Sequence, residues 1–417
     1  MVSWIPTSFL LTSVILMLPF GKLSDMYGRK KIYISGIVTL TIASLLASFS
    51  PNIYWLLACR VLQGVGAAQT MGSGMAIITG VFPKESRGAP LGYAATAVYI
   101  GLTSGPLLGG FFTDHFGWRS VFLFHLPVAI SVAVMTLWKL KGDWKSEIRP
   151  KFDIIGALTF AIWAILVLLG LSFMPSWQGV FTLLVSLVFG AFFIYHQSHT
   201  EHPLVRVGAL RANRVFSFSL ISAFLLYSAT FPITFLLSLY LQYIKGVSPS
   251  LAGQYLIVQA LIMALVAPLA GRLSDIYEPR LLTTFGCACV AVGFALLMRI
   301  GFDTPIYYVP LSQALFGLGF GFFTTPNNHA ALGSLTNAGL GIASAILNLS
   351  RTLGNMIGMG VVMMIIAINM GDALIVPENY NQLLAAIKTV IIISFCYSII
   401  AGFYSFYRGR VREKIAD

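Results

Sequence analysis

Charged side chains are scarce in this chain. Only 10% of its 417 residues are Asp, Glu, Lys or Arg, and acidic residues number 14. A soluble domain carries about 25% charged residues, so the composition excludes an ordinary soluble fold. A disordered arm is excluded as well, since 57% of the residues are hydrophobic and no long charged stretch occurs. With a mean hydropathy of +0.85, the composition indicates a membrane protein.

Cysteine is also rare. Its four occurrences lie within apolar runs and lack the spacing of metal ligands, so they are expected to be small buried hydrophobes and neither disulfides nor a metal site. No phosphate-binding Walker loop is present, which excludes a self-contained ATP pump. We therefore expect a protein that is not an enzyme and needs no cofactor. The cysteines are Cys59, Cys287, Cys289 and Cys396.

Long apolar runs fill most of the sequence. A bilayer core about 30 Å thick requires roughly 20 apolar residues per helix, and thirteen runs meet that need. The expected fold is therefore all-α, a polytopic membrane protein. The predicted spans are 4–20, 32–49, 54–78, 91–112, 121–138, 154–173, 177–195, 216–241, 251–270, 281–298, 307–325, 341–368 and 383–406.

Basic residues explain the formal charge of +12. Sorted by alternate loops, 20 of the 26 Lys and Arg residues fall on one side and only three on the other. This asymmetry is the positive-inside rule, so the rich side is cytoplasmic. The basic excess is topological, and nucleic acid is not an expected partner. The carboxy terminus is then inside and, with thirteen spans, residue 1 outside.

An internal repeat relates the two halves of the chain. Residues 21–30 read GKLSDMYGRK and residues 271–280 read GRLSDIYEPR, at an offset of 250 and each at the cytoplasmic end of a span. Duplicated halves of this kind are typical of transporters. Within its own half, the second copy is preceded by two spans, 216–241 and 251–270, whereas the first copy is preceded by one, 4–20. By symmetry we expect one further helix before residue 1.

The first copy resembles the cytoplasmic loop motif of the major facilitator superfamily, G-x-x-x-D-x-x-G-R-[RK]-[RK]. The resemblance implies a loop that latches the two halves in one access state. An aspartate here can bind arginine or a helix amino terminus, and glycines permit a sharp turn. In the second copy the later glycine is replaced by Glu278, followed by Pro279, which predicts a weaker latch. The gating residues are Gly21, Asp25, Gly28, Arg29, Lys30, Lys31, Gly271, Asp275 and Arg280.

A second motif resembles the antiporter signature of that superfamily, G-x8-G-x3-G-P-x2-G-G. Small residues permit close helix contact, and proline bends a span at a fixed place. Ordinary glycine-mediated packing is the alternative interpretation. The motif residues are Gly92, Gly101, Gly105, Pro106, Gly109 and Gly110.

Four residues are candidates for proton coupling. Arg60 and Gln63 match the motif R-x-x-Q-G-x-G-A-A, and Arg351 lies inside a later span. An unpaired guanidinium in the membrane is costly, so each arginine should pair, face a cavity or snorkel to the surface. No carboxylate falls in mid-membrane. The coupling acid is therefore expected in the preceding helix, as the resemblance implies, or else Asp114 at the outer mouth serves.

The number of spans indicates which subgroup of the superfamily the chain resembles. Two extra helices separate the halves, and with one preceding helix the total is fourteen, as in the fourteen-spanner drug:proton antiporters. The predicted domains are an N-terminal bundle (1–141), a central two-helix insertion with basic linkers (142–214) and a C-terminal six-helix bundle (215–417).

The C-terminal spans supply candidate substrate-binding residues, namely Tyr227, Phe231, Gln259, Asn327 and Asn328. Interhelical hydrogen bonding or lipid contact is the alternative for each of them. Without a mid-membrane acid there is no counter-charge for a cation, so a large amphipathic or lipophilic substrate is expected.

The sequence therefore predicts a secondary transporter that exports organic compounds, including drugs, in exchange for protons. A specific metabolite or siderophore exporter is the alternative within transport, and a non-transporting fragment or transporter-like sensor is the alternative outside it. The expected partners are a small organic substrate, protons and the lipid bilayer. We expect a monomer in the cytoplasmic membrane of a prokaryote.

Overall fold

The computed structural model describes residues 4–83, 86–142, 152–205, 208, 212–335, 340–371 and 375–410. Every regular element in those ranges is helical, which confirms the all-α prediction. Thirteen α-helices occur there, with one π-helical turn and one 3₁₀ turn. They are α1 (Trp4–Tyr27), α2 (Arg29–Ser48), α3 (Ile53–Val81), α4 (Gly88–Phe116), α5 (Ser120–Lys139), α6 (Ile154–Phe173), α7 (Trp177–His199), α9 (Arg214–Leu239), η2 (Tyr240–Ile244), α10 (Pro249–Ile276), α11 (Pro279–Leu297), α12 (Tyr308–Gly333), α13 (Leu340–Met370), η3 (Pro377–Asn379) and α14 (Tyr380–Tyr407).

Ten helices in the described part of the chain are long and apolar enough to cross a membrane. The other three, α3, α4 and α12, have the length but are diluted by glycine and polar residues. Such residues are common where helices approach closely or line a polar region in a membrane protein. These three helices carry the predicted antiporter motif, the Arg60 motif and the adjacent Asn327 and Asn328.

Polar side chains mark where several helices begin. In each case the side chain just before the helix accepts a hydrogen bond from a backbone N–H in the first turn. These residues are Asn52, Asp153, Ser176, Asn213 and Ser248. Such caps satisfy donors that have no partner inside the helix. The apolar spans are therefore delimited by short polar signals.

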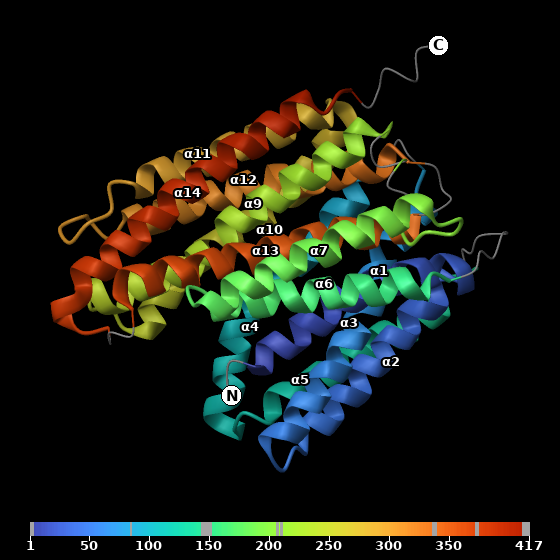
Figure 1. Ribbon diagram of the computed structural model, residues 1–417, viewed down its shortest axis with the longest axis horizontal. Helices are drawn as coiled ribbons and strands as arrows, with labels where there is room; N and C mark the ends of the chain where they lie inside the picture. Colours follow the sequence, from blue (N-terminus) through green and yellow to red (C-terminus); the bar gives the residue numbers. More distant parts are fainter. Residues whose placement is uncertain are drawn as a thin grey trace.

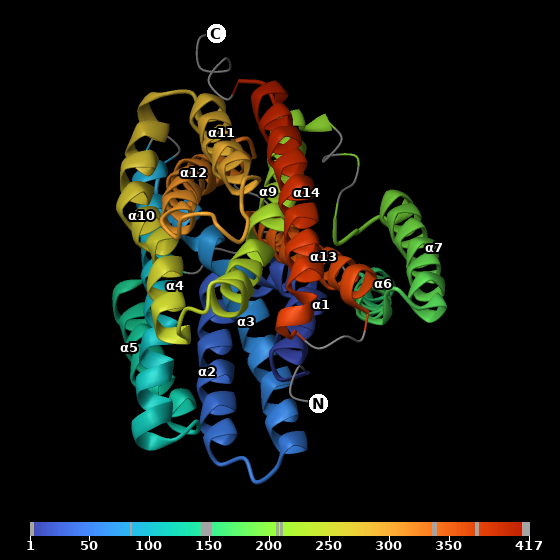
Figure 2. The same cartoon turned by 90° about the vertical axis from the view of Figure 1, so that its left-hand side faces the viewer.

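The helices form two groups with a pair between them. Helices α1–α5 lie below and α9–α14 above in Figure 1, and Figure 2 shows α6 and α7 beside the seam where α1 meets α13. The two groups meet along α4 with α10 and along α1 with α13, and α6 contacts both α1 and α13. Two equivalent pairs of helices thus join the amino-terminal and carboxy-terminal halves, and α3 with α13 and α4 with α12 add further contacts.

The first cytoplasmic motif is mostly helical and not a loop. Helix α1 continues through Gly21 and Asp25 to Tyr27, and α2 starts at Arg29. Gly28 alone makes the turn between them, with a φ of 115° that favours glycine. The motif therefore lies at a rigid helix end, which fixes the direction of the Asp25 side chain.

Candidate functional site

Asp25 binds the amino terminus of a helix in the other half. Its Oδ2 accepts a hydrogen bond of 3.0 Å from the Ile342 backbone N–H, in the first turn of α13. Its Oδ1 accepts hydrogen bonds from Arg29 Nε and Nη2 at 3.0 and 2.9 Å. Both side chains are buried. The carboxylate satisfies otherwise unpaired N–H groups and the positive end of the α13 dipole.

Asp275 makes the reciprocal contact. Its Oδ1 and Oδ2 accept hydrogen bonds from the Gly88 and Ala89 backbone N–H groups at 2.8 and 3.2 Å, at the amino terminus of α4. His329 Nδ1 lies 3.9 Å from Asp275 Oδ1 and 3.1 Å from Ser274 Oγ. The two repeat copies, related by the offset of 250, thus bind crosswise.

The halves are also in close contact around these aspartates. A Cβ atom added to Gly88 would lie 2.3 Å from the Gly271 carbonyl oxygen, and one added to Gly92 would lie 2.8 Å from the Ala267 oxygen. Arg272 donates to the Tyr93 hydroxyl at 2.9 Å. These contacts lie at the α4 start and the α10 end, so the halves are joined at the end that the sequence predicts to be cytoplasmic.

Other contacts are made by the remaining predicted gating residues. Gly21 packs against α3 next to Gly72. Lys30 donates to the Leu140 carbonyl after α5, and Lys31 is exposed. Arg280 lies over the Phe406 ring at 5.7 Å.

The predicted antiporter motif lies along α4. Gly92 is its member in the tight contact with α10, while Cβ atoms added to Gly101 and Gly109 would meet nothing within 4 Å. The surroundings of Gly105, Pro106 and Gly110, and the side chain of Asp114, lie outside the described residues. The structure therefore gives one motif position a packing role.

Arg60 is paired inside the membrane region. Its Nη1 donates to Gln63 Oε1 at 3.0 Å, and Gln63 Nε2 donates to Ser44 Oγ on α2 at 2.8 Å. The guanidinium also lies 5.8 and 5.4 Å from the rings of Phe9 and Phe122. The charge is thus paired with a polar side chain and lies near two aromatic rings.

A second polar cluster forms around Arg351 on α13. Its Nη2 donates to Asn328 Oδ1, and its guanidinium carbon lies 5.5 Å from the centre of the Tyr227 ring. Tyr227 and Asn328 come from α9 and α12, so three helices converge here. Two of the predicted substrate-binding residues therefore meet a proton-coupling candidate.

The other three predicted substrate-binding residues do not join that cluster. Phe231 is 51% exposed on the outer surface of α9. Gln259 packs through its backbone oxygen near Gly317. Asn327 turns the other way and accepts a hydrogen bond from Arg408 Nη1 at 3.0 Å.

Arg408 is a buried cation that sequence reasoning missed. It follows α14, is fully buried, and also donates to Ser219 Oγ at 3.3 Å. Burial lowers the pKa of Arg408 to about 10, while the nearby Glu278 carboxylate acts to raise it. Since even this pKa is above neutral pH, the group stays charged. Its position after the last apolar run gave no signal of burial.

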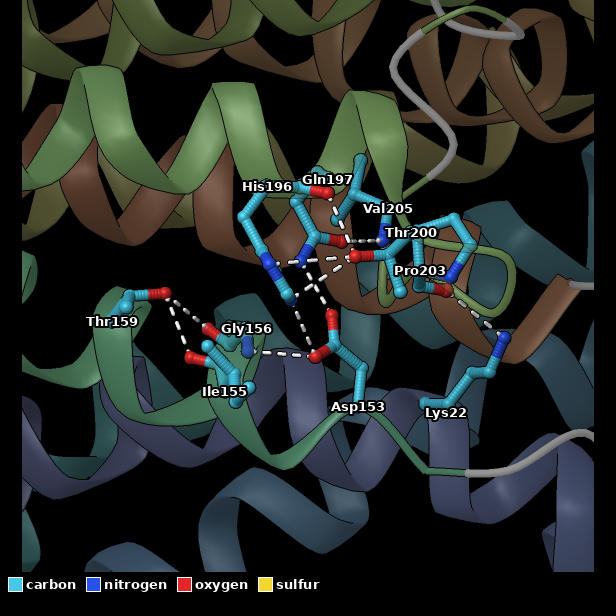
Figure 3. A network of polar contacts seen from close by, with 10 residues as sticks. All are labelled: Lys22, Asp153, Ile155, Gly156, Thr159, His196, Gln197, Thr200, Pro203 and Val205. Carbon is cyan, nitrogen blue, oxygen red and sulfur yellow. Dashed lines mark hydrogen bonds and ion pairs between the residues drawn. The ribbon is translucent and has the colours of Figure 1, made fainter.

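Asp153 organises a second network that the sequence did not reveal, shown in Figure 3. Its carboxylate accepts hydrogen bonds from the Gly156 N–H at 2.8 Å and Gln197 Nε2 at 2.7 Å, and lies 2.9 Å from His196 Nε2. Gln197 Oε1 in turn accepts from the Val205 N–H at 3.0 Å. The network ties the start of α6 to the end of α7 and to the segment that follows.

That segment is attached to α1. Lys22 Nζ, within the first cytoplasmic motif, donates to the Pro203 carbonyl at 3.1 Å. Leu204 and Val205 share a buried apolar cluster with residues of α1, α6 and α13. The central helix pair is therefore anchored beside the Asp25 contact.

We expect Asp153→Asn to destabilise the protein in a pH-dependent way. Burial acts to raise the pKa of Asp153, but hydrogen bonds from Gly156, His196 and Gln197 outweigh it and lower the pKa. A lowered folded-state pKa contributes stability above the unfolded pKa of about 4, which is lost as the pH falls through the folded-state value. Thermal unfolding in detergent should show a loss of about 1–3 kcal/mol at pH 7.

The matched control is Ser176→Ala, which removes the uncharged cap of α7. Its effect should be the same at every pH, whereas the difference between wild type and Asp153→Asn should shrink below about pH 4. A pH-independent effect of Asp153→Asn would contradict the charge-based explanation.

Comparisons with known proteins agree with this architecture. The sequence profile of the Major Facilitator Superfamily matches residues 1–359. The chain is 32% identical over 361 residues to the riboflavin transporter RibZ of Clostridioides difficile (strain 630), covering 86% of this chain and 78% of RibZ. It is 28% identical over 369 residues to the multidrug transporter protein MdtP of Bacillus subtilis (strain 168), covering 86% and 67%.

Solved structures share the fold at low identity. The human organic anion transporter MFSD10 (TETRAN) aligns with a TM-score of 0.69 and 14% identity over 96% of this chain and 83% of that one. The proton:xylose symporter XylE aligns with a TM-score of 0.65 and 14% identity, over 97% and 85%. The family profile and the relative at 32% identity together show that the chain belongs to the Major Facilitator Superfamily of membrane transporters.

Proposed function

We propose that this protein is a secondary active exporter that exchanges organic compounds for protons by alternating access. The observation that carries the proposal is the crosswise binding of Asp25 and Asp275 to the amino termini of α13 and α4. Each contact joins the two halves at their cytoplasmic ends and can break as a unit. Two such contacts provide a gate with two states.

The substrate range is proposed from the relatives. MdtP and the multidrug resistance protein Stp of Mycobacterium tuberculosis (strain CDC 1551 / Oshkosh), 26% identical over 370 residues, support multidrug export. The riboflavin transporter RibZ, at 32% identity, favours a second candidate, a specific exporter or carrier of one metabolite. Comparing uptake of riboflavin with that of unrelated dyes separates the two.

We also propose the fourteen-spanner drug:proton subgroup, supported by the extra pair α6–α7 between the halves. A helix before residue 1 stays a prediction from the repeat. The cytoplasmic membrane of a prokaryote is the proposed location, in keeping with the bacterial relatives.

Transport is tested in everted vesicles with an acidic interior. The wild type should take up a fluorescent substrate, and addition of that substrate should release protons from the vesicles, measured with a pH-sensitive dye. An uncoupler should abolish uptake. Uptake that persists without a proton gradient would remove proton exchange from the proposal.

We expect Arg60→Gln to impair coupling. The change removes a half-buried charged donor to Gln63, worth roughly 1.5–3 kcal/mol, so uptake should fall about tenfold or more and proton release should disappear. Arg299→Gln, which removes an exposed charge beyond α11, is the control and should transport normally. Normal proton release by Arg60→Gln would exclude Arg60 from coupling.

A further inference from the structure

The Arg351 cluster lies just beyond the closed cytoplasmic contact. Asn348, one turn earlier on α13, donates through Nδ2 to the Met71 carbonyl on α3 at 2.8 Å and so joins the two halves. Helix α13 starts at the cytoplasmic end, so Arg351 is one turn farther from the cytoplasm. On the outer side of this barrier, Arg351 is the only charged residue of α13.

Aromatic rings form one side of the cluster. The Tyr227 ring lies under the Arg351 guanidinium at 5.5 Å and packs edge-on against Phe320 at 5.1 Å. The Tyr227 hydroxyl lies 3.5 Å from Thr324 Oγ1, and Thr324 is 4% exposed. Ring, hydroxyl and amide groups thus converge from α9 and α12 on one cation of α13.

The cation has unused hydrogen-bonding capacity within the described part of the chain. Asn328 Oδ1 accepts a hydrogen bond from Arg351 Nη2, whereas Arg351 Nε is buried without a hydrogen-bond partner among the described residues. Asn355 Oδ1, one turn farther along α13, is also buried without a hydrogen-bond partner among the described residues. Arg351 is not a member of the ion pairs Asp25–Arg29, Asp153–His196 and Asp275–His329.

A guanidinium inside the membrane region is costly when no carboxylate pairs with it. Among side chains, the planar fork of arginine is the best geometric match for a carboxylate. A flat ring beside the guanidinium can stack on or against Tyr227. We infer that Arg351, Asn328 and Tyr227 form a substrate subsite that selects aromatic anions over aromatic cations. This inference rests on the proposed transport function and adds the substrate class to it.

Two dyes with the same three-ring skeleton test the selection. Carboxyfluorescein is anionic and rhodamine 123 is cationic, and binding of each to the purified protein in lipid nanodiscs can be measured by fluorescence anisotropy. The wild type should bind carboxyfluorescein about tenfold or more tightly than rhodamine 123, as expected for a charge-assisted hydrogen bond.

Three variants locate the effect. Arg351→Gln should remove that advantage and leave rhodamine 123 binding unchanged, while Arg351→Lys should retain part of it, since an ammonium keeps the charge but not the fork. Tyr227→Leu should weaken both dyes. The matched control is Lys388→Gln, which deletes an exposed charge from α14 in the same half and should change neither affinity.

Several results would overturn the inference: no carboxyfluorescein binding, equal or tighter binding of rhodamine 123, or an Arg351→Gln variant that binds carboxyfluorescein normally. The proposed function fails separately. Proton-driven uptake of rhodamine 123 in everted vesicles, without anion selection, would retain the exporter and reject this subsite. Anion binding without any proton-driven uptake would retain the subsite and reject the exporter.

Discussion

Replacing Gly88 with leucine should nearly abolish transport. Even the first atom of a side chain at Gly88 would lie 2.3 Å from the Gly271 carbonyl oxygen and 2.5 Å from Asp275 Oδ1. Backbone cannot yield as a flexible side chain can, so α4 and α10 must separate. Overpacking of this kind costs roughly 3 kcal/mol, which lowers the population of the cytoplasm-closed state about a hundredfold relative to the open one.

Because alternating access requires both states, uptake by everted vesicles should fall by a similar factor. Substrate binding from the cytoplasmic side should remain. The matched control is Gly253→Leu on α10, where an added Cβ meets nothing within 4 Å. If Gly88→Leu transports as well as Gly253→Leu, the close contact of α4 with α10 is not part of the transport cycle.

The sequence was sufficient to predict the helices and the pseudo-symmetry. Apolar runs located all thirteen α-helices of the described chain because backbone groups in lipid must be satisfied within each helix. Their ends were less predictable. Helix α1 extends seven residues beyond its apolar run, from Gly21 to Tyr27, because helices continue past the hydrocarbon where polar residues reach the interface.

The partners of the motif residues were beyond prediction. Asp25 accepts a hydrogen bond from a backbone N–H that lies 317 positions away in the chain. Because the donor is a backbone group, the identity of residue 342 gives no sign of this bond. Similarly, adjacent asparagines diverge: Asn328 binds Arg351 while Asn327 binds Arg408. Helices that are apolar on all sides carry no periodic signal for which face is central. For the same reason, the sequence did not predict that Phe231 is exposed.

Asp25→Asn should impair transport far more than Asp275→Asn, although the two residues occupy equivalent places. In both variants an amide oxygen can still accept one backbone hydrogen bond, so the direct capping loss is about 0.5–2 kcal/mol. Asp25 differs because it also pairs with Arg29, and both side chains are less than 10% exposed. Removing one member of a buried ion pair costs about 3–5 kcal/mol.

At the position that corresponds to Arg29, the second copy has Pro279. Its neighbour is His329 at 3.9 Å, and its side chain is 18% exposed. Asp275→Asn should therefore reduce uptake by only a few-fold, and Asp25→Asn by about a hundredfold. The sequence-based prediction of a weaker second latch becomes a measurable difference between the two copies.

Spin labels at Tyr27 and Tyr277 report the gate directly. Both residues are exposed, one in each half: Tyr27 ends α1, and Tyr277 directly follows α10. Cys396 is the exposed native cysteine to replace first. The distance distribution between the labels should shift to the open state strongly in Asp25→Asn and weakly in Asp275→Asn.

A second substitution separates the two causes of the Asp25 effect. Asp25→Asn combined with Arg29→Gln removes the charge that the first change leaves without its carboxylate, so closure should recover to about the level of Asp275→Asn. Recovery would assign most of the effect to burial of the unpaired Arg29 charge. The remainder would come from the helix-terminus contact, which Asp25 makes with α13 and Asp275 makes with α4. If the double variant stays open, the contact with α13 is itself the stronger of the two latches, and the asymmetry between the halves lies in the helix termini and not in Arg29.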